Sequence, residues 1–393
     1  MTREELKKLA LSLKFPNVAL QLPTGYGKSR IALEILNSKY PEGNILIVAP
    51  KLVLFKTWQT EIDKWFPNNK WNITFTTYIS FPKYKERMWS GVIFDECHHI
   101  TERVIIAFNK NNYKSTLYLS ATIKKDQFNW LKLIHRNKID FIKLSLRDAI
   151  IDDVLPEPTV YCIPLNLDIE TEDQVYIRNK HNKNIIECEY KDRNKYWRRP
   201  KTQLHVKCTQ KQYIEMIDNE ISFYKTAFMN NGLLYQKNIW LRLAGERLKY
   251  LSNLKIDVIK SILNKLANKR TITFCADINQ SEILGKYSIN SKKKKSSETL
   301  SKFNDEEINH ITCCNMLNEG VNLYNCQIGI WAIYNSSTIM IVQKVGRLLR
   351  HMDPIIILPY YRGTREEEIV NKMLENFNSD NIKTINNLDE LCN

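Results

Sequence analysis

The chain has 393 residues, more than one hydrophobic core usually organises, and 43% of them are hydrophobic, as in a globular protein. Its formal net charge of +15 at pH 7 indicates a polyanionic partner, with a merely lysine-biased surface as the alternative. The chain has no Cys-x-x-Cys pair, so we expect free thiols and no zinc site. It also has no signal-peptide core and no apolar run of membrane-spanning length, so we expect a soluble, intracellular, cytoplasmic protein that is neither secreted nor membrane-bound.

The first part of the chain alternates short apolar runs with helix-compatible stretches. An amphipathic pattern predicts a helix over residues 5–13, and a second helix is predicted at Ser29–Leu36. The predicted strands are Val18–Leu22, Ile45–Ala49, Ile73–Tyr78, Val92–Phe94 and Leu117–Leu119. Strands that alternate with helices favour a parallel sheet with right-handed crossovers.

The second part begins after an acidic, proline-bearing stretch, Asp148–Pro158. We place a domain boundary there, which gives domains 1–150 and 151–393. A basic, helical insertion is expected at about residues 170–250, with long helical patterns over 209–266. The strands predicted around it are residues 159–167, Thr271–Cys275, Ile308–Thr312, Ile328–Ile333 and Ile355–Leu358.

A glycine-rich segment, Pro23-Thr24-Gly25-Tyr26-Gly27-Lys28-Ser29, lies between the first predicted strand and the following helix. Glycines allow a tight turn whose backbone N–H groups approach phosphate oxygens, and the helix N-terminus favours the same negative charge. Lys28 can reach the β- and γ-phosphates of a nucleotide, and Ser29 can bind Mg²⁺. Leu22 stands where the strict pattern has glycine, so a chance Gly-Lys-Ser in a surface turn is the alternative.

Two carboxylates end a later apolar strand, Val92-Ile93-Phe94-Asp95-Glu96. Phosphoryl transfer needs one acid to hold Mg²⁺ and another to orient the attacking water. Asp95 suits the first task and Glu96 the second. Two acids at a strand end are more often a solvated loop, but their combination with a lysine-bearing phosphate loop favours nucleotide hydrolysis.

These segments resemble motifs of the superfamily 2 DExH-box helicases, with Asp95-Glu96-Cys97-His98 as the DExH box. Further segments that resemble family motifs, in the family's order, are Ala49-Pro50-Lys51-Leu52-Val53 with Trp58, Thr76-Thr77-Tyr78, Ser120-Ala121-Thr122, Phe274-Cys275-Ala276-Asp277, Asn318-Glu319-Gly320-Val321-Asn322 and Gln343-Lys344-Val345-Gly346-Arg347-Leu348-Leu349-Arg350. The chain is most similar to the branch of type III restriction subunits, XPB and UvsW, in a compact phage- or virus-like form.

The resemblance implies an α/β fold of two RecA-like parallel-sheet domains in tandem, with ATP and Mg²⁺ between them. It assigns nucleotide binding to Thr24, Gly25, Tyr26, Gly27, Lys28, Ser29 and Asn322, and Mg²⁺ to Ser29 and Asp95. It assigns catalysis to Lys28, Asp95, Glu96, Gln343, Arg347 and Arg350. The two arginines would act as arginine fingers, with surface charge at helical spacing as the alternative. It assigns the coupling of nucleotide state to domain closure to His98, Ser120 and Thr122.

The chain departs from the family pattern at several positions. No Q-motif precedes the phosphate loop, so the base of the nucleotide is not predicted. Asn322 replaces the acid that contacts the ribose, and Cys313-Cys314 replace a Ser/Thr pair that contacts the nucleic-acid backbone. A thiol is a weak hydrogen-bond partner, so that contact is expected to be weaker. Lys344 replaces an arginine and keeps its charge.

Nucleic acid is expected across both domains, with Lys51, Thr76 and Thr77 as first-domain contacts implied by the resemblance. Residues 178–201 form the most basic stretch, with nine lysines and arginines, among them Arg198 and Arg199, against three acids. Tyr190, Tyr196 and Trp197 lie among these charges, and cations with stacking rings suit nucleic acid. The alternative is a solvated insertion, which we also favour for the Lys292–Lys295 run.

The sequence thus predicts an ATP-dependent helicase or translocase that acts on nucleic acid, DNA in preference to RNA, in repair, recombination, replication or transcription remodelling. A duplex-DNA translocase subunit without strand separation, which would serve a partner nuclease, is one alternative. An RNA helicase is another, and a binding module that has lost catalysis is a third. No membrane partner is expected.

Overall fold

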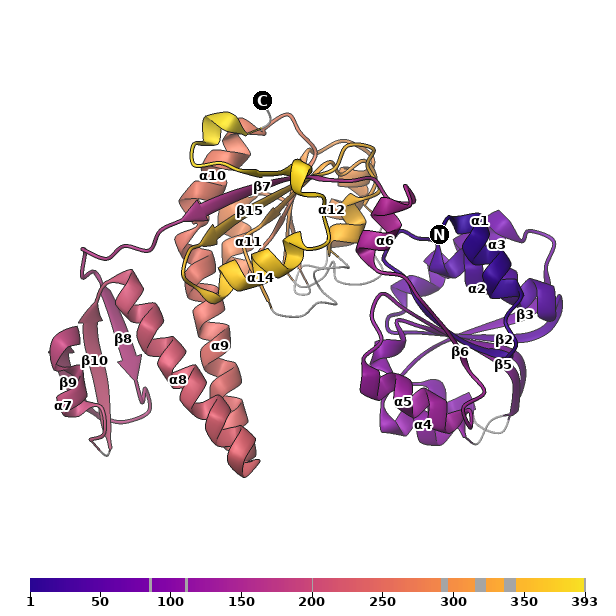
Figure 1. The fold of residues 1–393 in the computed structure, drawn as a ribbon, viewed down its shortest axis with the longest axis horizontal. Helices are drawn as coiled ribbons and strands as arrows, with labels where there is room; N and C mark the ends of the chain where they lie inside the picture. The colour runs from indigo at the N-terminus through magenta and orange to yellow at the C-terminus, as the bar shows by residue number, and fades with distance from the viewer. Residues whose placement is uncertain are drawn as a thin grey trace.

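The computed structural model describes residues 1–84, 87–109, 112–199, 201–290, 296–314, 323–335 and 344–391. These residues form two parallel sheets with flanking helices and a smaller sheet that carries a long helical hairpin (Figure 1). The two parallel-sheet α/β domains confirm the predicted fold class. Among the described residues, no helix combines the length and the apolar character needed to cross a lipid bilayer.

The first sheet is six-stranded and parallel, in the order β3-β2-β4-β5-β1-β6. Its strands are β1 (Asn17–Gln21), β2 (Glu42–Ala49), β3 (Lys70–Thr77), β4 (Met88–Asp95), β5 (Asn112–Ser120) and β6 (Asp140–Lys143). Helices α1 (Arg3–Leu11), α2 (Lys28–Lys39) and α3 (Val53–Trp65) pack on one face, and α4 (Glu102–Phe108) and α5 (Lys125–Ile134) on the other. Covering both faces buries the central strands, which is why they read as continuous apolar runs.

All five strands predicted in this half are confirmed, with small shifts in their ends. The first helix begins at Arg3, two residues before the amphipathic pattern. The reason is a capping box, in which the Glu5 N–H donates to the Thr2 hydroxyl (3.3 Å) and the Thr2 N–H donates to the Glu5 carboxylate (2.8 Å).

The second sheet is seven-stranded and parallel, in the order β12-β13-β11-β14-β15-β7-β16. Its strands are β7 (Thr159–Leu165), β11 (Thr271–Phe274), β12 (Ser288–Ile289), β13 (His310–Cys313), β14 (Ile328–Trp331), β15 (Ile355–Tyr361) and β16 (Ile382–Thr384). Its helices are α10 (Ile256–Lys265), α11 (Ile278–Leu284), α12 (Ser296–Asn304) and α14 (Arg365–Leu374). The connection from the first sheet contains α6 (Leu146–Ile151), and the domain boundary at residue 150 stays a prediction.

The insertion between β7 and β11 contains a three-stranded sheet that was not predicted, in addition to the expected helices. It consists of β8 (Gln174–Arg178), β9 (Asn184–Glu189) and β10 (Thr202–Cys208), with the short α7 (Arg193–Tyr196). The sheet forms because buried Leu204, Val206 and Cys208 alternate with more exposed residues and pack against α8. The predicted helical stretch is divided into α8 (Gln210–Asn231), α9 (Leu234–Leu254) and α10.

Candidate nucleotide site between the two sheets

Three chemically important segments meet at one edge of the first sheet. Parallel strands end at the same edge of a sheet, where ligands of open α/β sheets bind. The C-terminal ends of β1, β4 and β5 carry the predicted phosphate loop, Asp95-Glu96-Cys97-His98 and Ser120-Ala121-Thr122. The fold therefore brings together residues that lie about 100 positions apart in the sequence.

The phosphate loop is built around two glycines with left-handed backbone, Gly25 (φ 91°) and Gly27 (φ 99°). α2 starts directly after Gly27 without a side-chain cap, so its first N–H groups are open to an anion. The Lys28 ammonium donates to the carbonyls of Leu22 (3.0 Å) and Pro23 (3.3 Å) and thereby folds over its own loop. Burial lowers the pKa of Lys28, while the carboxylates of Glu96 and Asp95 act in the opposite direction.

Asp95 is held from two sides at the end of β4. The Trp58 indole N–H donates to Oδ2 of Asp95 (2.9 Å), and the Tyr78 hydroxyl donates to the Asp95 carbonyl (2.7 Å). Burial and the neighbouring Glu96 raise the pKa of the Asp95 carboxyl to about 6, although the Trp58 hydrogen bond opposes this shift. The carboxyl group is thus fixed in orientation and lies in a position that disfavours an uncompensated negative charge.

Glu96 connects the cleft to the end of β5 through a polar chain. Its backbone is left-handed (φ 50°), a strained conformation that tends to occur at functional sites. Its carboxylate Oε2 lies 3.3 Å from His98 Nδ1, which lies 3.1 Å from the Ser120 hydroxyl. That hydroxyl donates to the Thr122 carbonyl (2.8 Å) and accepts from the Thr122 N–H (3.2 Å). The Gln127 amide donates to the His98 carbonyl (2.9 Å).

The second domain supplies the opposite wall of the site. A cavity of about 460 Å³ is lined by residues of both halves of the chain. Among the predicted site residues, those that line it are Thr24, Gly25, Gly27, Lys28, Ser29, Asp95, Glu96, Arg347 and Arg350. Arg347 is only 4% exposed, so its guanidinium belongs to the domain interface rather than to a solvated helix face.

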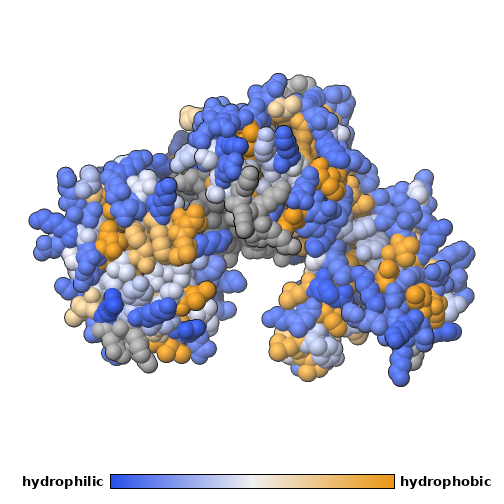
Figure 2. Space-filling model, turned by 180° about the vertical axis from the view of Figure 1, so that it is seen from behind, coloured by the Kyte–Doolittle hydropathy of each residue, from blue (hydrophilic) through white to orange (hydrophobic). Residues whose placement is uncertain are grey.

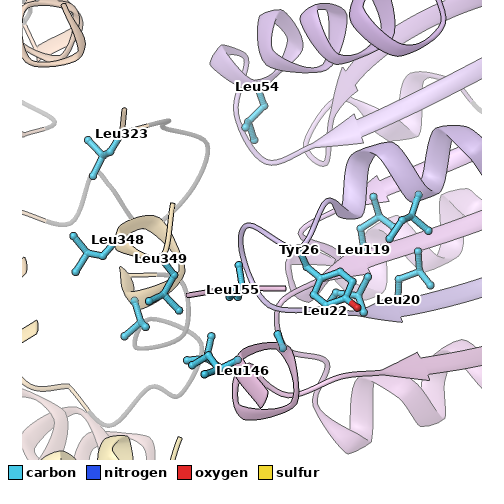
Figure 3. Packing of buried hydrophobic residues seen from close by; sticks show 14 of the residues in the cluster. Leu20, Leu22, Tyr26, Leu54, Leu119, Leu146, Leu155, Leu323, Leu348 and Leu349 are labelled. Atoms are coloured by element: carbon cyan, nitrogen blue, oxygen red, sulfur yellow. The ribbon is translucent and has the colours of Figure 1, made fainter. Parts of the chain in front are cut away.

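The domain interface is closely packed beside this cavity. Figure 3 shows Leu349 from the second domain on the side that faces Leu146 and Leu155, with Tyr26 beyond them, and all four belong to one hydrophobic cluster. A Cβ atom added at Gly346 would lie 2.7 Å from the Thr24 carbonyl oxygen. Gly346 therefore allows the two backbones to approach each other next to the phosphate loop.

Other predicted residues are placed differently. The Tyr26 side chain is buried, and its hydroxyl donates to the Met1 carbonyl (2.6 Å) rather than lining the cavity. Asn322 and Gln343 lie outside the described residues. Ser120, Thr122 and His98 are not among the residues that line the cavity, and they connect to it through Glu96.

The predicted nucleic-acid contacts lie in two separate regions. Lys51 lies just after β2, and Thr77 is the last residue of β3. Both lie at the sheet edge that also carries the phosphate loop, and Lys51 is exposed. Thr76 is 3% exposed, which leaves Thr77 as the better contact of the pair. Arg198 and Arg199 are exposed on the insertion, where Arg199 lies over the Tyr196 ring (4.8 Å).

Sequence reasoning matched Trp58 to a family motif but missed its hydrogen bond to Asp95, and it missed the role of Arg3. The signal for Trp58 is a tryptophan in an otherwise polar stretch of α3, which marks a buried contact but not its partner. Arg3 donates to the carbonyls of Gly25 (3.2 Å) and Val154 (3.4 Å), which ties the N-terminal helix to the phosphate loop and to the interdomain connection. No local pattern identifies such a long-range contact.

Two family models match the chain, and they fall on its two halves. Residues 2–125 match the family described as type III restriction enzyme, res subunit, and residues 254–352 match the helicase conserved C-terminal domain. No curated protein matches the sequence.

Solved helicase structures share the fold over almost the whole chain. The Hef helicase domain of Pyrococcus furiosus is 14% identical, covers 94% of this chain and 97% of its own, and has a TM-score of 0.52. Dbp5 of S. cerevisiae, bound to RNA and ADP BeF3, is 10% identical, with coverages of 97% and 89% and a TM-score of 0.59. With the res subunit model in the first half and the helicase C-terminal model in the second, on a fold shared with solved helicases, the chain belongs to the superfamily 2 helicases.

Proposed function

We propose that this helicase is a nucleic-acid-stimulated ATPase that moves along DNA or separates its strands. The observation that carries the proposal is the cavity between the two sheets. A phosphate loop and two carboxylates line it from the first domain, and Arg347 and Arg350 line it from the second. A site divided in this way makes hydrolysis depend on how the domains are closed, which a motor requires.

Several features of the chain fit a bound Mg²⁺–ATP. The N-terminus of α2 has no side-chain cap, and the buried Thr24 hydroxyl has no hydrogen-bond partner among the described residues. Ser29 and Asp95 offer the hard oxygen ligands that Mg²⁺ prefers, alongside phosphate oxygens. The ion would neutralise charge on the phosphates during their transfer. Lys28 would leave the Leu22 and Pro23 carbonyls to bind the β- and γ-phosphates.

Hydrolysis is assigned to groups on opposite walls of the cavity. Glu96 would orient the attacking water and accept its proton, since its carboxylate lies next to Asp95 at the strand end. Arg347 and Arg350 would stabilise the charge that develops on the transferred phosphoryl group. Because Glu96 also contacts His98, the polar chain through Ser120 to Thr122 would report the state of the nucleotide to the end of β5.

The comparisons support two alternatives for the polynucleotide that the chain acts on, DNA and RNA. DNA is preferred because the first half matches the res subunit family of type III restriction enzymes. That match also favours a duplex translocase without strand separation and the branch predicted from the sequence. RNA is the other alternative, because the Dbp5 structure contains RNA.

The decisive experiment is ATP hydrolysis by the full chain with single-stranded, duplex and forked DNA, and with RNA. We expect stimulation, strongest with DNA, and its loss in Lys28→Ala. Displacement of a triplex strand without duplex separation would select the translocase. Hydrolysis that no polynucleotide stimulates would contradict the proposal, and so would full activity of Lys28→Ala.

The raised pKa of Asp95 predicts a pH-dependent affinity for Mg²⁺. The carboxyl group is protonated below about pH 6 in the unliganded protein, and Mg²⁺ must displace that proton. The affinity should therefore be full above pH 6 and fall as pH falls through 6, by about tenfold per pH unit. Calorimetric titration of Mg²⁺ into the ATP complex at pH 5 to 8 measures it. Asp95→Asn should bind Mg²⁺ weakly and lose this pH dependence of the affinity. An unchanged pH profile of Mg²⁺ affinity in Asp95→Asn would contradict the role of Asp95 as a Mg²⁺ ligand.

Gly346→Ala should lower turnover by separating the two domains next to the phosphate loop. Its Cβ would meet the Thr24 backbone at 2.7 Å, a contact that flexible side chains cannot relieve. We expect a loss of about tenfold or more in the maximal ATPase rate, because misplacing catalytic groups by about 1 Å costs about 10²-fold. Gly245→Ala is the matched control, since nothing lies within 4 Å of its added Cβ. Equal rates for the two variants would show that this close approach is not needed.

A further inference from the structure

The hairpin of α8 and α9 ends in exposed apolar side chains. Gly232 takes the left-handed conformation (φ 68°) that ends α8, and the chain reverses into α9. We call residues 229–235 the hairpin tip. Its large side chains are exposed by 65% (Met229), 45% (Leu233), 71% (Leu234) and 58% (Tyr235). Figure 2 shows hydrophobic residues gathered on the projecting end of the hairpin, and such a contiguous surface marks a binding site.

The hairpin between Glu220 and Glu246 carries positive charge. Residues 221–245 contain Lys225, Lys237 and Arg242 and no aspartate or glutamate, and because Arg242 is paired with Glu246 (2.7 Å), Lys225 and Lys237 supply the charge nearest the tip. The Lys237 ammonium lies 5.6 Å from the centre of the Phe228 ring. A partner that suits this surface combines dense negative charge with flat apolar faces. Nucleic acid offers both, as phosphates and as base pairs exposed at a duplex end.

The same helix leads from the tip to a basic pocket on the insertion. A cavity of about 370 Å³ between α7 and α8 is lined by Phe223 together with Arg193, Trp197 and Arg198. Phe223 is 66% exposed and precedes Met229 by six residues, about 9 Å along the helix. A single strand that leaves the tip would thus meet cations and a stacking ring within about two nucleotides.

The hairpin is rooted in the second domain. Near the end of α9, the buried Ser252 hydroxyl donates to the Ala332 carbonyl that follows β14 (2.7 Å). The Gln280 amide of α11 donates back to the Ser252 carbonyl (2.6 Å). Because α9 has 21 residues, the tip stands about 30 Å from this root. The tip therefore moves with the second domain when the nucleotide cleft opens or closes.

We propose that the hairpin tip is the strand-separating element of this helicase, packing Tyr235 and Leu234 against the terminal base pair of a duplex. The Gln236 amide donates to the Tyr235 hydroxyl (3.3 Å), while the ring itself is the group that would stack. Movement of the second domain along a strand would drive the tip into the duplex end. The inference rests on the proposed motor function, which supplies that movement.

The test compares strand separation with ATP hydrolysis in the full chain. The double variant Leu234→Ser/Tyr235→Ala should separate a forked duplex at least about tenfold more slowly, since base stacking on an aromatic ring has that magnitude. Its ATPase rate with single strands should stay within about twofold, because the tip is distant from the cavity. Tyr235→Phe keeps the ring and should behave as wild type. Leu133→Ser, at a leucine 75% exposed on α5, is the matched control for loss of a surface apolar group.

A second readout detects contact without turnover. A 2-aminopurine at the fork junction should lose fluorescence on binding of the wild-type protein and of Tyr235→Phe, but not of the double variant. Unchanged strand separation by the double variant would overturn the inference, as would a parallel fall of its ATPase rate. The inference would also be overturned if the double variant still separated strands but, alone among the variants, lost self-association or binding to anionic vesicles. A wild-type protein that hydrolyses ATP with DNA but separates no duplex overturns this inference alone, whereas absence of stimulated hydrolysis overturns the motor proposal.

Discussion

Glu96→Gln is expected to reduce ATP turnover by about 10²–10⁴-fold while leaving ATP binding intact. The substitution keeps the size of the side chain and removes the carboxylate that would take the proton from the attacking water. ATP binding should persist because the phosphate loop and Asp95 are unchanged. Phosphate release at saturating nucleic acid and equilibrium binding of a fluorescent ATP analogue measure the two effects separately.

A second consequence distinguishes this role from general damage to the site. Glu96 is one of the two main causes of the raised pKa of Asp95, the other being burial. Removal of its charge should therefore move the pH below which Mg²⁺ affinity falls to a lower value. Glu102→Gln, at an exposed glutamate at the start of α4, is the matched control and should behave as wild type. Turnover by Glu96→Gln within about tenfold of wild type would contradict the assignment.

The strands were predictable because their burial leaves a local signature. Ile45–Ala49 is apolar throughout, and Val18–Leu22 is apolar except for Gln21, because helices cover both faces of the sheet. The order of the motifs then indicated which strand ends bear the predicted site residues. The cavity brings nine of the predicted residues together, although their sequence separation gives no distance. Their arrangement follows from the parallel topology, which the local patterns predicted, together with the docking of two domains, which only the family resemblance implied.

The insertion shows where local patterns are insufficient. Its basic composition suggested a charged surface, but part of that charge is paired within the fold. Arg178 lies 2.5 Å from the buried Glu220 of α8, and Lys180 lies 3.5 Å from Glu246 of α9. Both acids come from outside the basic stretch of the sequence. The cations that stay on the surface, such as Arg198, could be identified only once these pairs were known.

Contacts that position the proposed catalytic groups were also beyond prediction. Trp58 was matched to a motif, yet its hydrogen bond to Asp95 depends on how α3 packs against the end of β4. Gly346 was matched in the same way, but its closeness to Thr24 is a property of the domain interface. Sequence patterns record which residue types a site needs. They do not record which residues from other elements hold those types in place.

Substitution of Arg347, in the second domain, is the other change expected to have a large effect on ATP turnover. Arg347→Ala should lower turnover by about 10³–10⁵-fold, because an arginine finger stabilises charge that develops only in the transition state. ATP affinity should change little for the same reason. Arg347→Lys keeps the charge but loses the planar group that can donate two parallel hydrogen bonds, so it should recover only part of the rate. Single-turnover hydrolysis with saturating DNA measures the chemical step.

Because Arg347 is buried at the interface, loss of activity could also follow from a disrupted fold, and the design must separate the two causes. Arg365→Ala, which removes an exposed arginine of the same domain with an ion pair to Glu368, is the control for charge and should retain full activity. Unfolding by urea should show equal midpoints for wild type and Arg347→Lys. Added guanidinium, below denaturing concentrations, should partly restore hydrolysis to Arg347→Ala, since the ion can occupy the space that the side chain leaves next to the γ-phosphate. A structural role would give no such rescue, and full activity of Arg347→Ala would show that the second domain closes the cavity without taking part in the chemistry.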